Sequence, residues 1–258
     1  MDNGHKFVFI GGLHRSGTSL FFKSLKTHPD ISGFSNTGVD EDEGQFLQSV
    51  YPIAKRYGGP GKFGFAEDMH LTEKSPLVSA ENRTKLFQEW SKWWNLNKPV
   101  LVEKSPPNII KTRFLQALFP EAAFILLIRH PIAVALATKK WSYTSLRSLI
   151  AHWVRCHSLM LKDRVHLKQV MVLRYEDFVQ DPNRVLQTVF HMLDLKPIPF
   201  RLEMKSGINE KYFDQWQTYR KKWVNQWYFH QIEKRFETEV NRFGYSLVSP
   251  ERYQSFSL

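Results

Sequence analysis

Cysteine is almost absent: Cys156 is the only one among 258 residues. A single cysteine excludes an internal disulfide framework and a cysteine-rich zinc site. It lies in a stretch with helical spacing, so we expect a small, buried side chain. The cysteine usage predicts a soluble protein of a reducing compartment, the cytoplasm.

Long apolar runs are missing as well. No run of roughly 18 apolar residues occurs, so no membrane span is expected. The chain leads from Met1 to His5 directly into its first apolar run, and we see no signal peptide there. Internal repeats, low-complexity segments and linkers are not found either. One domain over residues 1–258 is therefore predicted.

Acidic residues are fewer than basic ones. The 25 Asp and Glu stand against 36 Lys and Arg, for a formal net charge of +11. This balance favours anionic partners such as nucleotides, acidic substrates, nucleic acid or a membrane surface. The basic residues are spread through the chain, so a dedicated nucleic-acid tail is not expected. One short basic cluster, residues 220–222, is expected on a solvated face, with contact to an anion as the alternative.

A glycine-rich turn at residues 11–20 follows the apolar run 7–10 and precedes residues with helical spacing. Glycines let the backbone approach an anion, and the first N–H groups of a helix point at it unpaired. Arg15 adds a positive charge. Hydroxyl groups come from Ser16, Thr18 and Ser19. We interpret the turn as a phosphate cradle; the alternative is a turn that merely joins a strand to a helix.

The cradle lacks the residues of a nucleoside triphosphatase. From Gly12 to Gly17 the spacing matches a Walker A loop, but Thr18 stands where its lysine belongs. A Walker B strand would end in an acid for Mg²⁺, whereas the apolar run 122–128 is followed by Arg129. These differences argue against metal-dependent phosphoryl transfer, and no metal requirement is predicted.

Apolar runs and helical stretches alternate along the chain. Strands are predicted at residues 7–10, 99–102, 122–128 and 170–173. Helices are predicted at residues 81–95, 132–140, 145–168 and 212–243, and after a cap formed by Asp181 and Pro182. The predicted fold is α/β: a P-loop-type three-layer sandwich whose central, mainly parallel sheet of about four or five strands is flanked by helices.

Lys104, Arg129 and Tyr175 each stand at or just after the end of a predicted strand. Open α/β sheets bind ligands at the carboxyl ends of their strands, so these side chains are expected to face one site. Lys104 is expected to stabilise negative charge on a transferring group, or alternatively to pair with Glu103. Tyr175 is expected to stack on or hydrogen-bond a base, or to close the end of the sheet.

Four acids in a row, residues 40–43, follow a polar loop. One interpretation is the acid-decorated start of a helix, which the helix dipole favours. The other is that one of these carboxylates serves as a general base beside the anion site. Both interpretations are compatible with each other.

Taken together, these motifs resemble the sulfotransferases that use 3′-phosphoadenosine-5′-phosphosulfate (PAPS), in the broad group with bacterial and Golgi-type members. The resemblance runs from residue 7 to about residue 190. Residues 12–19 are similar to the 5′-phosphosulfate loop and residues 128–131 to the 3′-phosphate motif. Residues 174–177 look like the family's tyrosine-glutamate-aspartate segment, and residues 103–106 resemble its lysine-bearing strand end.

The resemblance implies roles for these residues. Arg129 binds the 3′-phosphate, and Tyr175 lies near the nucleotide. Lys104, together with Arg15, stabilises charge on the transferred group. The 5′-phosphosulfate is held by Arg15, Ser16, Gly17, Thr18 and Ser19.

The base and the second 3′-phosphate ligand are less clearly marked. A glutamate follows a His-Pro-Asp segment in the tyrosylprotein branch, which favours Glu43 as the base, with little margin over Asp42. Glu41 and a histidine are further alternatives. Ala137 stands where a second 3′-phosphate serine is usual, with Thr138 beside it. The arginine-lysine-glycine motif of the cytosolic branch is absent.

The predicted reaction is in-line transfer of a sulfuryl group from PAPS to a hydroxyl or amine, leaving adenosine 3′,5′-bisphosphate. The acceptor is unidentified: a small molecule, carbohydrate, lipid or peptide. Its pocket is expected at loops 33–70 and 141–148, with Trp141 and Tyr143 in its wall. Two other functions stay open. One is a P-loop small-molecule kinase, and the other is a non-catalytic nucleotide or nucleic-acid binder suggested by charge alone.

Overall fold

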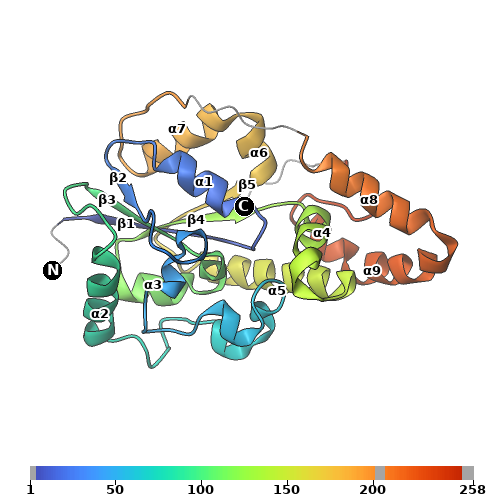
Figure 1. Ribbon diagram of the computed structural model, residues 1–258, viewed down its shortest axis with the longest axis horizontal. Helices are drawn as coiled ribbons and strands as arrows, with labels where there is room; N and C mark the ends of the chain where they lie inside the picture. Colours follow the sequence, from blue (N-terminus) through green and yellow to red (C-terminus); the bar gives the residue numbers. More distant parts are fainter. Residues whose placement is uncertain (1–3, 201–206, 252–258) are drawn as a thin grey trace.

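A computed structural model describes residues 4–200 and 207–251. Within these residues the centre is a five-stranded sheet of order β2-β3-β1-β4-β5, in which every neighbouring pair is parallel (Figure 1). Strands β3 and β4 are buried along their whole length, as parallel strands between helical layers are. The strands are β1 (Lys6–Gly12), β2 (Ile31–Gly33), β3 (Val100–Lys104), β4 (Ala123–Ile128) and β5 (Gln169–Arg174).

Helices cover both faces of the sheet, so the predicted three-layer sandwich is confirmed (Figure 1). One face carries α1 (Thr18–Leu25), α6 (Tyr175–Gln180) and α7 (Pro182–Met192). The other face carries α2 (Ala80–Ser91), α3 (Thr112–Leu118) and α5 (Leu146–Arg164). The end toward which the strands run is occupied by α4 (Pro131–Ser142), α8 (Glu210–Lys221) and α9 (Trp223–Asn241).

Side chains at the helix starts explain several boundaries. Ser79 and Ser145 accept hydrogen bonds from the N–H groups three residues ahead, at the starts of α2 and α5. Asp181 does the same for α7, with Pro182 in the first turn, so this predicted cap is confirmed. At α4 the ring of His130 accepts from the N–H of Ile132.

The predicted C-terminal helix over residues 212–243 is wrong as one element. The chain leaves the helical conformation at Lys222, whose ψ is 122°. It then reverses, so that α8 and α9 pack against each other as a hairpin. An ion pair of 2.7 Å between Arg220 and Glu233 joins the two helices. Burying one face of each helix against the other stabilises the chain more than continuing a single helix would.

Residues 34–79 contain short 3₁₀ turns and neither α-helix nor strand. The acids at 40–43 lie there, and the interpretation of a helix N-terminus decorated with acids is wrong. Only one 3₁₀ turn forms, and Glu41 and Asp42 have positive φ angles of 53° and 50°. A single turn aligns too few peptide dipoles to attract acids. The turns are η1 (Asp40–Asp42), η2 (Gly44–Phe46), η3 (Ala54–Tyr57), η4 (Phe63–Phe65) and η5 (Glu67–Met69), with η6 (Pro106–Ile110) further along the chain.

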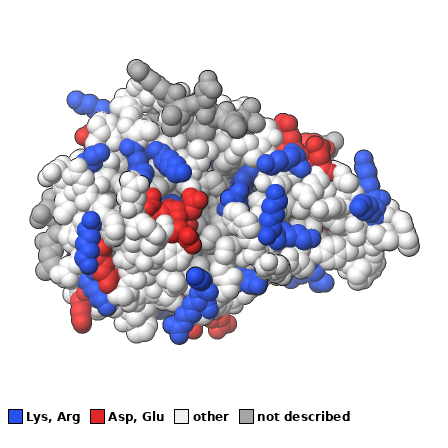
Figure 2. Space-filling model, in the orientation of Figure 1, with Lys and Arg blue, Asp and Glu red and all other residues white. Residues whose placement is uncertain are grey.

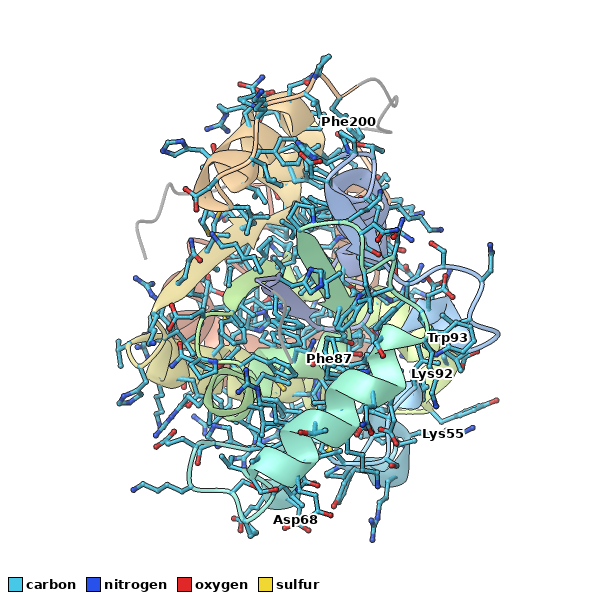
Figure 3. All side chains as sticks on the ribbon, turned by 90° about the vertical axis from the view of Figure 1, so that its left-hand side faces the viewer. Lys55, Asp68, Phe87, Lys92, Trp93 and Phe200 are labelled. Atoms are coloured by element: carbon cyan, nitrogen blue, oxygen red, sulfur yellow. The ribbon has the colours of Figure 1, made fainter. Side chains whose placement is uncertain are left out.

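Two apolar cores hold the molecule together. One surrounds the sheet with α1, α2, α3 and α7, and the second lies among α4, α5, α8 and α9. Side chains fill the space on both sides of the strands (Figure 3). Cys156 is fully buried in the second core, as predicted. Within the described residues, every helix is too short or too polar to cross a bilayer.

Candidate active site

The register of the strands brings their carboxyl ends to one edge of the sheet. Ile10 of β1 lies opposite Lys104 on one side and Ile125 on the other. Since Ile128 of β4 pairs with Arg174 of β5, the next residues, Arg129 and Tyr175, emerge side by side. The glycine-rich loop follows β1, which lies between β3 and β4. This is the point in a parallel sheet where ligands bind.

The loop after β1 is shaped by two left-handed residues. Arg15 has φ 70° and Gly17 has φ 95°. A Cβ atom at position 17 would collide with the ring of Tyr175, so only glycine fits there. Helix α1 then begins with no side-chain cap. The first N–H groups of a helix lack intrahelical partners, and here they face the cleft described next.

A cleft of about 260 Å³ lies over this loop. Of the predicted site residues, Ser16 and Lys104 do not line it. The hydroxyl of Ser16 donates to the carbonyl of Leu13 at 2.6 Å, and its N–H does so at 3.0 Å, so Ser16 shapes the loop from beneath. The cleft is lined by His14, Arg15, Gly17, Thr18, Ser19, Leu20, Glu41, Glu43, Pro106, Arg129, Trp141 and Tyr175.

Lys104 is fully buried under the cleft and contacts three residues of its wall. Its Nζ lies 3.4 Å from Oγ of Ser19 and 3.4 Å from Oε1 of Glu43. It also donates to the carbonyl oxygen of Glu41 at 2.8 Å. The alternative pairing with Glu103 is wrong, because consecutive residues of a strand point to opposite faces.

Glu43 has the environment of a general base. Burial raises the pKa of its carboxyl group, against the opposing charge of Lys104 and a 2.5 Å hydrogen bond from Nε2 of Gln45. Burial also raises the pKa of Glu103, behind Gly44, to about 7. A carboxylate with a raised pKa accepts a proton more readily near neutral pH.

The other candidate bases are less suitable. Burial alone would raise the pKa of Asp42, but hydrogen bonds from the N–H and hydroxyl of Thr37 lower it. Asp42 also lines neither this cleft nor the cavity beside it. Burial, with the charge of Lys104, lowers the pKa of His14 to about 3, which makes it a weak base. Glu41 lines the cleft but is exposed.

Arg129 is held in place by Asn209, which the sequence did not indicate, and by two predicted site residues, Arg15 and Tyr175. Its Nε and Nη2 donate to Oδ1 of Asn209 at 2.9 and 2.7 Å, and its Nη1 donates to the carbonyl of Arg15 at 2.9 Å. Its guanidinium lies 4.2 Å from the ring centre of Tyr175. Asn209 donates in turn to Glu176 at 2.6 Å. Glu176 was within the quoted motif, whereas Asn209 carried no signal 80 residues away.

Helix α4 contributes one aromatic side chain to the cleft. The guanidinium of Arg15 lies 4.6 Å from the ring centre of Trp141. Tyr143, expected beside it, is wholly exposed and lines no cavity here. Ala137 and Thr138 are buried and also do not line the cleft. Thr138 therefore does not take the place of the missing serine.

A second cavity of about 600 Å³ adjoins the cleft. The two share His14, Glu41, Glu43 and Trp141, so the Glu43 carboxylate stands between them. The rest of its wall comes from residues 40–60, which confirms that loop 33–70 shapes a pocket. Acidic side chains gather near the middle of the face in Figure 2, between basic ones.

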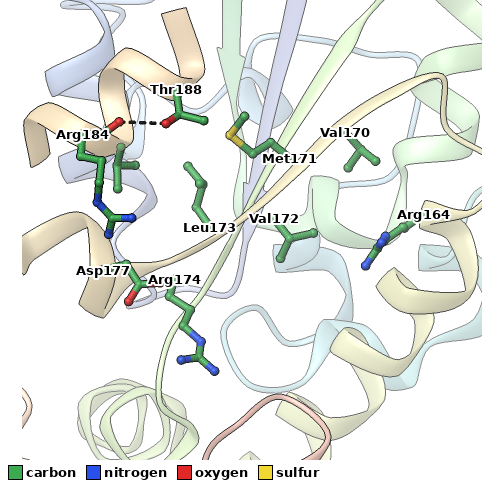
Figure 4. Close-up of a pocket in the computed structure, with 10 residues that line it drawn as sticks. Arg164, Val170, Met171, Val172, Leu173, Arg174, Asp177, Arg184 and Thr188 are labelled. Carbon is green, nitrogen blue, oxygen red and sulfur yellow. Dashed lines mark hydrogen bonds between the residues drawn. The ribbon is translucent and has the colours of Figure 1, made fainter. Parts of the chain in front are cut away.

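A further hollow of about 420 Å³ follows the edge strand β5 (Figure 4). It is lined by residues 170–174, with Arg164 and Arg184 at its sides, and contains none of the predicted site residues. Within the described residues no three His, Cys, Asp or Glu side chains are grouped to hold a metal ion.

Known sulfotransferases are similar to this chain in sequence. A family model described as "Sulfotransferase family" matches residues 8–199. The chain is 23% identical over 201 residues to protein-tyrosine sulfotransferase 1 of Danio rerio, covering 73% of this chain and 53% of that protein. It is 23% identical over 209 residues to protein-tyrosine sulfotransferase A of Caenorhabditis elegans, covering 75% and 52%. The chain thus spans about half the length of these two relatives.

Solved structures share the fold. The sulfotransferase domain from the curacin biosynthetic pathway superposes with a TM-score of 0.51 at 16% identity, over 83% of this chain and 91% of that one. Sulfotransferase STF1 from Mycobacterium tuberculosis H37Rv gives a TM-score of 0.50 at 13% identity, over 82% and 71%. The family match covers most of the chain, including the glycine-rich loop and the strand ends that build the cleft. The chain therefore belongs to the sulfotransferase family and is a transferase enzyme.

Proposed function

We propose that this protein transfers a sulfuryl group from PAPS to a hydroxyl or amine of an acceptor held in the second cavity. One observation carries the proposal. The buried carboxylate of Glu43 stands between an anion-binding cleft and an adjoining cavity, and Lys104 connects it to the loop of that cleft. A donor and an acceptor in these two spaces would meet at a base.

The residues of the cleft fit an anionic nucleotide donor. The first N–H groups of α1 and the guanidinium of Arg15 would hold the 5′-phosphosulfate. Arg129 would bind the 3′-phosphate, since its hydrogen bonds to Asn209 and to the carbonyl of Arg15 use three of the five N–H donors of a guanidinium. The ring of Tyr175 packs against Gly17 of the loop and against the guanidinium of Arg129, so it lies beside both proposed phosphate positions.

The chain's own residues account for the transfer step. Glu43 takes the proton as the acceptor oxygen or nitrogen bonds to sulfur, while the bond from sulfur to the leaving phosphate oxygen breaks. Arg15 and the loop amides stabilise the charge on the sulfuryl and phosphate oxygens, and such fixed donors are usually the largest contribution to catalysis. Lys104 acts from beneath, through Ser19 and Glu43. The products are the sulfated acceptor and adenosine 3′,5′-bisphosphate.

Calorimetric titration with adenosine 3′,5′-bisphosphate tests the donor. Binding in the micromolar range is expected, with affinity lower by about tenfold or more in Arg15→Ala and Arg129→Ala, because each loses a charge-assisted hydrogen bond. Arg242→Ala, which removes an exposed arginine outside the cleft, is the matched control and should bind normally. Tighter binding of ATP with Mg²⁺ would overturn the proposal and favour a P-loop kinase.

A further inference from the structure

The tip of the hairpin formed by α8 and α9 exposes large apolar side chains. Trp223 is 83% exposed, Val224 60% and Trp227 72%. Residues four apart on a helix share a side, so the two tryptophans form one apolar face with Val224 beside them. The hairpin lies at one end of the long axis of the molecule (Figure 1). Among the described residues, none covers this face.

The interior of the hairpin does not need these side chains. Trp216 of α8 is fully buried, and its ring lies edge-on to Phe229 of α9 with 4.7 Å between the ring centres. The two helices therefore pack through residues on the opposite side from the exposed face. Large apolar side chains left outside a completed core mark a surface for interaction.

Exposed lysines lie beside the apolar face, at the turn between α8 and α9. Residues 220–227 contain one arginine and two lysines and no acid. Arg220 is paired with Glu233, whereas Lys221 and Lys222 are exposed. The N–H of Arg147 donates to the hydroxyl of Tyr228 at 3.0 Å, which brings the exposed start of α5 alongside. Figure 2 shows basic side chains at this end of the molecule.

We propose that this tip, consisting of Lys221, Lys222, Trp223, Val224 and Trp227, docks on an anionic lipid surface. Tryptophan has an apolar ring and one N–H donor, which suits the boundary between headgroups and acyl chains. Lysines beside it are attracted to anionic headgroups and extend apolar stems toward the bilayer. A protruding tip fits a planar surface, whereas single-stranded nucleic acid is bound along basic grooves.

Vesicle sedimentation of the full chain tests the proposal. The protein should bind phosphatidylcholine vesicles that contain phosphatidylserine about tenfold more tightly than vesicles of phosphatidylcholine alone. Lys221→Gln with Lys222→Gln should lower the affinity for the anionic vesicles about tenfold, because two cations near the surface are lost. Trp223→Ser with Trp227→Ser should lower it at least as much and remove the blue shift of tryptophan fluorescence on binding.

Matched controls lie elsewhere on the surface. Lys85→Gln with Lys92→Gln removes the same charge from α2 and the residue that follows it, at the opposite end of the molecule, where Figure 3 shows Lys92. Val165→Ser removes an apolar side chain that is 76% exposed at the end of α5. Both controls should bind vesicles like the unaltered protein. Titration with adenosine 3′,5′-bisphosphate should be unchanged in every variant, which checks folding and separates this proposal from the proposed function.

Several results would overturn membrane docking. These are no binding of the unaltered protein to anionic vesicles, or equal binding by the tip variants. A dimer in sedimentation velocity that the double tryptophan variant dissociates, without vesicle binding, would assign the face to a second copy of the chain. Binding of single-stranded RNA in place of vesicles, weakened by the same variants, would assign it to nucleic acid.

Discussion

The side chains of Glu43 and Lys104 illustrate how neighbouring groups determine reactivity in the cleft. Burial favours the neutral carboxyl group, while the ammonium of Lys104 favours the carboxylate. Burial is the larger effect, so the pKa of Glu43 lies above that of an ordinary glutamate. The same ammonium helps to keep His14 neutral. Together these effects leave Glu43 as the best-placed proton acceptor.

Glu43→Gln should lower kcat by roughly 10²- to 10⁴-fold, because a general base is removed. Binding of adenosine 3′,5′-bisphosphate should stay within about twofold, since Glu43 is not expected to hold the donor. The base acts only when deprotonated. Activity should therefore be lost as the pH falls through the pKa of Glu43, at a higher pH than for a solvent-exposed glutamate. A pH–rate profile measures this.

Glu41→Gln is the control for the base, because Glu41 lines the same cleft and cavity but is exposed. It should retain the acid limb of the pH–rate profile. A large loss of kcat in Glu41→Gln, with a normal rate in Glu43→Gln, would exchange the roles of the two residues.

At the scale of elements, the cradle depends on how the glycine-rich loop meets the start of α6. Tyr175 begins α6 and packs against Gly17, just before α1 begins. Asn209, just before α8, reaches back to Arg129 at the end of β4. Elements far apart in the sequence thus determine where the groups proposed to bind phosphate lie.

Gly17→Ala should weaken binding of the bisphosphate by about tenfold or more and lower the free energy of unfolding by roughly 1–3 kcal/mol. The added methyl group meets the Tyr175 ring, and the φ angle of 95° disfavours any residue with a Cβ. Calorimetric titration and chemical denaturation measure the two effects.

Gly38→Ala provides a matched control. Gly38 has a similar φ angle of 81°, but no atom lies within 4 Å of the added Cβ. Gly38→Ala should therefore lower the free energy of unfolding only by the cost of the backbone conformation. It should bind the bisphosphate normally. Equal effects of the two substitutions on binding would show that the contact between Gly17 and Tyr175 is unimportant.

At the scale of the whole molecule, the net charge of the chain and the charge of the second cavity's wall have opposite signs. The net charge of +11 favours an anionic donor. The wall of the second cavity instead contains Asp40, Glu41 and Glu43 against the single cation of Lys55. Glu43 is paired with Lys104, so the exposed acids Asp40 and Glu41 outnumber Lys55 among the other charged side chains of this wall.

If the enzyme accepts phenols as sulfuryl acceptors, kcat/KM should be highest for a cationic phenol and lowest for an anionic one. With PAPS as donor, tyramine should exceed 4-ethylphenol, and 4-ethylphenol should exceed 4-hydroxyphenylacetate, over a range of about tenfold from cation to anion. Steady-state kcat/KM values measure this order. Asp40→Asn with Glu41→Gln should compress the range.

Acids outside the cavity supply the comparison for this series. Glu67→Gln with Asp68→Asn removes two exposed acids that do not line the cavity, and should leave the order and its range unchanged. Equal kcat/KM values for the three phenols in the unaltered protein would contradict a role of the acidic wall in acceptor choice.

The sequence by itself determined the parts that depend on local chemistry. Apolar runs predicted the four longer strands, and the glycines with Arg15 predicted the turn before α1. The rule that ligands meet the ends of parallel strands placed Arg129 and Tyr175 in one cleft. Strand β2 has three residues, too few to show an apolar run.

Only the tertiary structure decided which groups meet across the chain. Lys104 pairs with Glu43 rather than with its neighbour Glu103, because the pleat of β3 separates consecutive side chains. Asn209 reaches Arg129 because α8 folds back over the ends of the strands. The split of the last helix and the second cavity likewise depend on packing. Burial and long-range contacts are properties of the assembled chain, and the order of residues along a segment does not contain them.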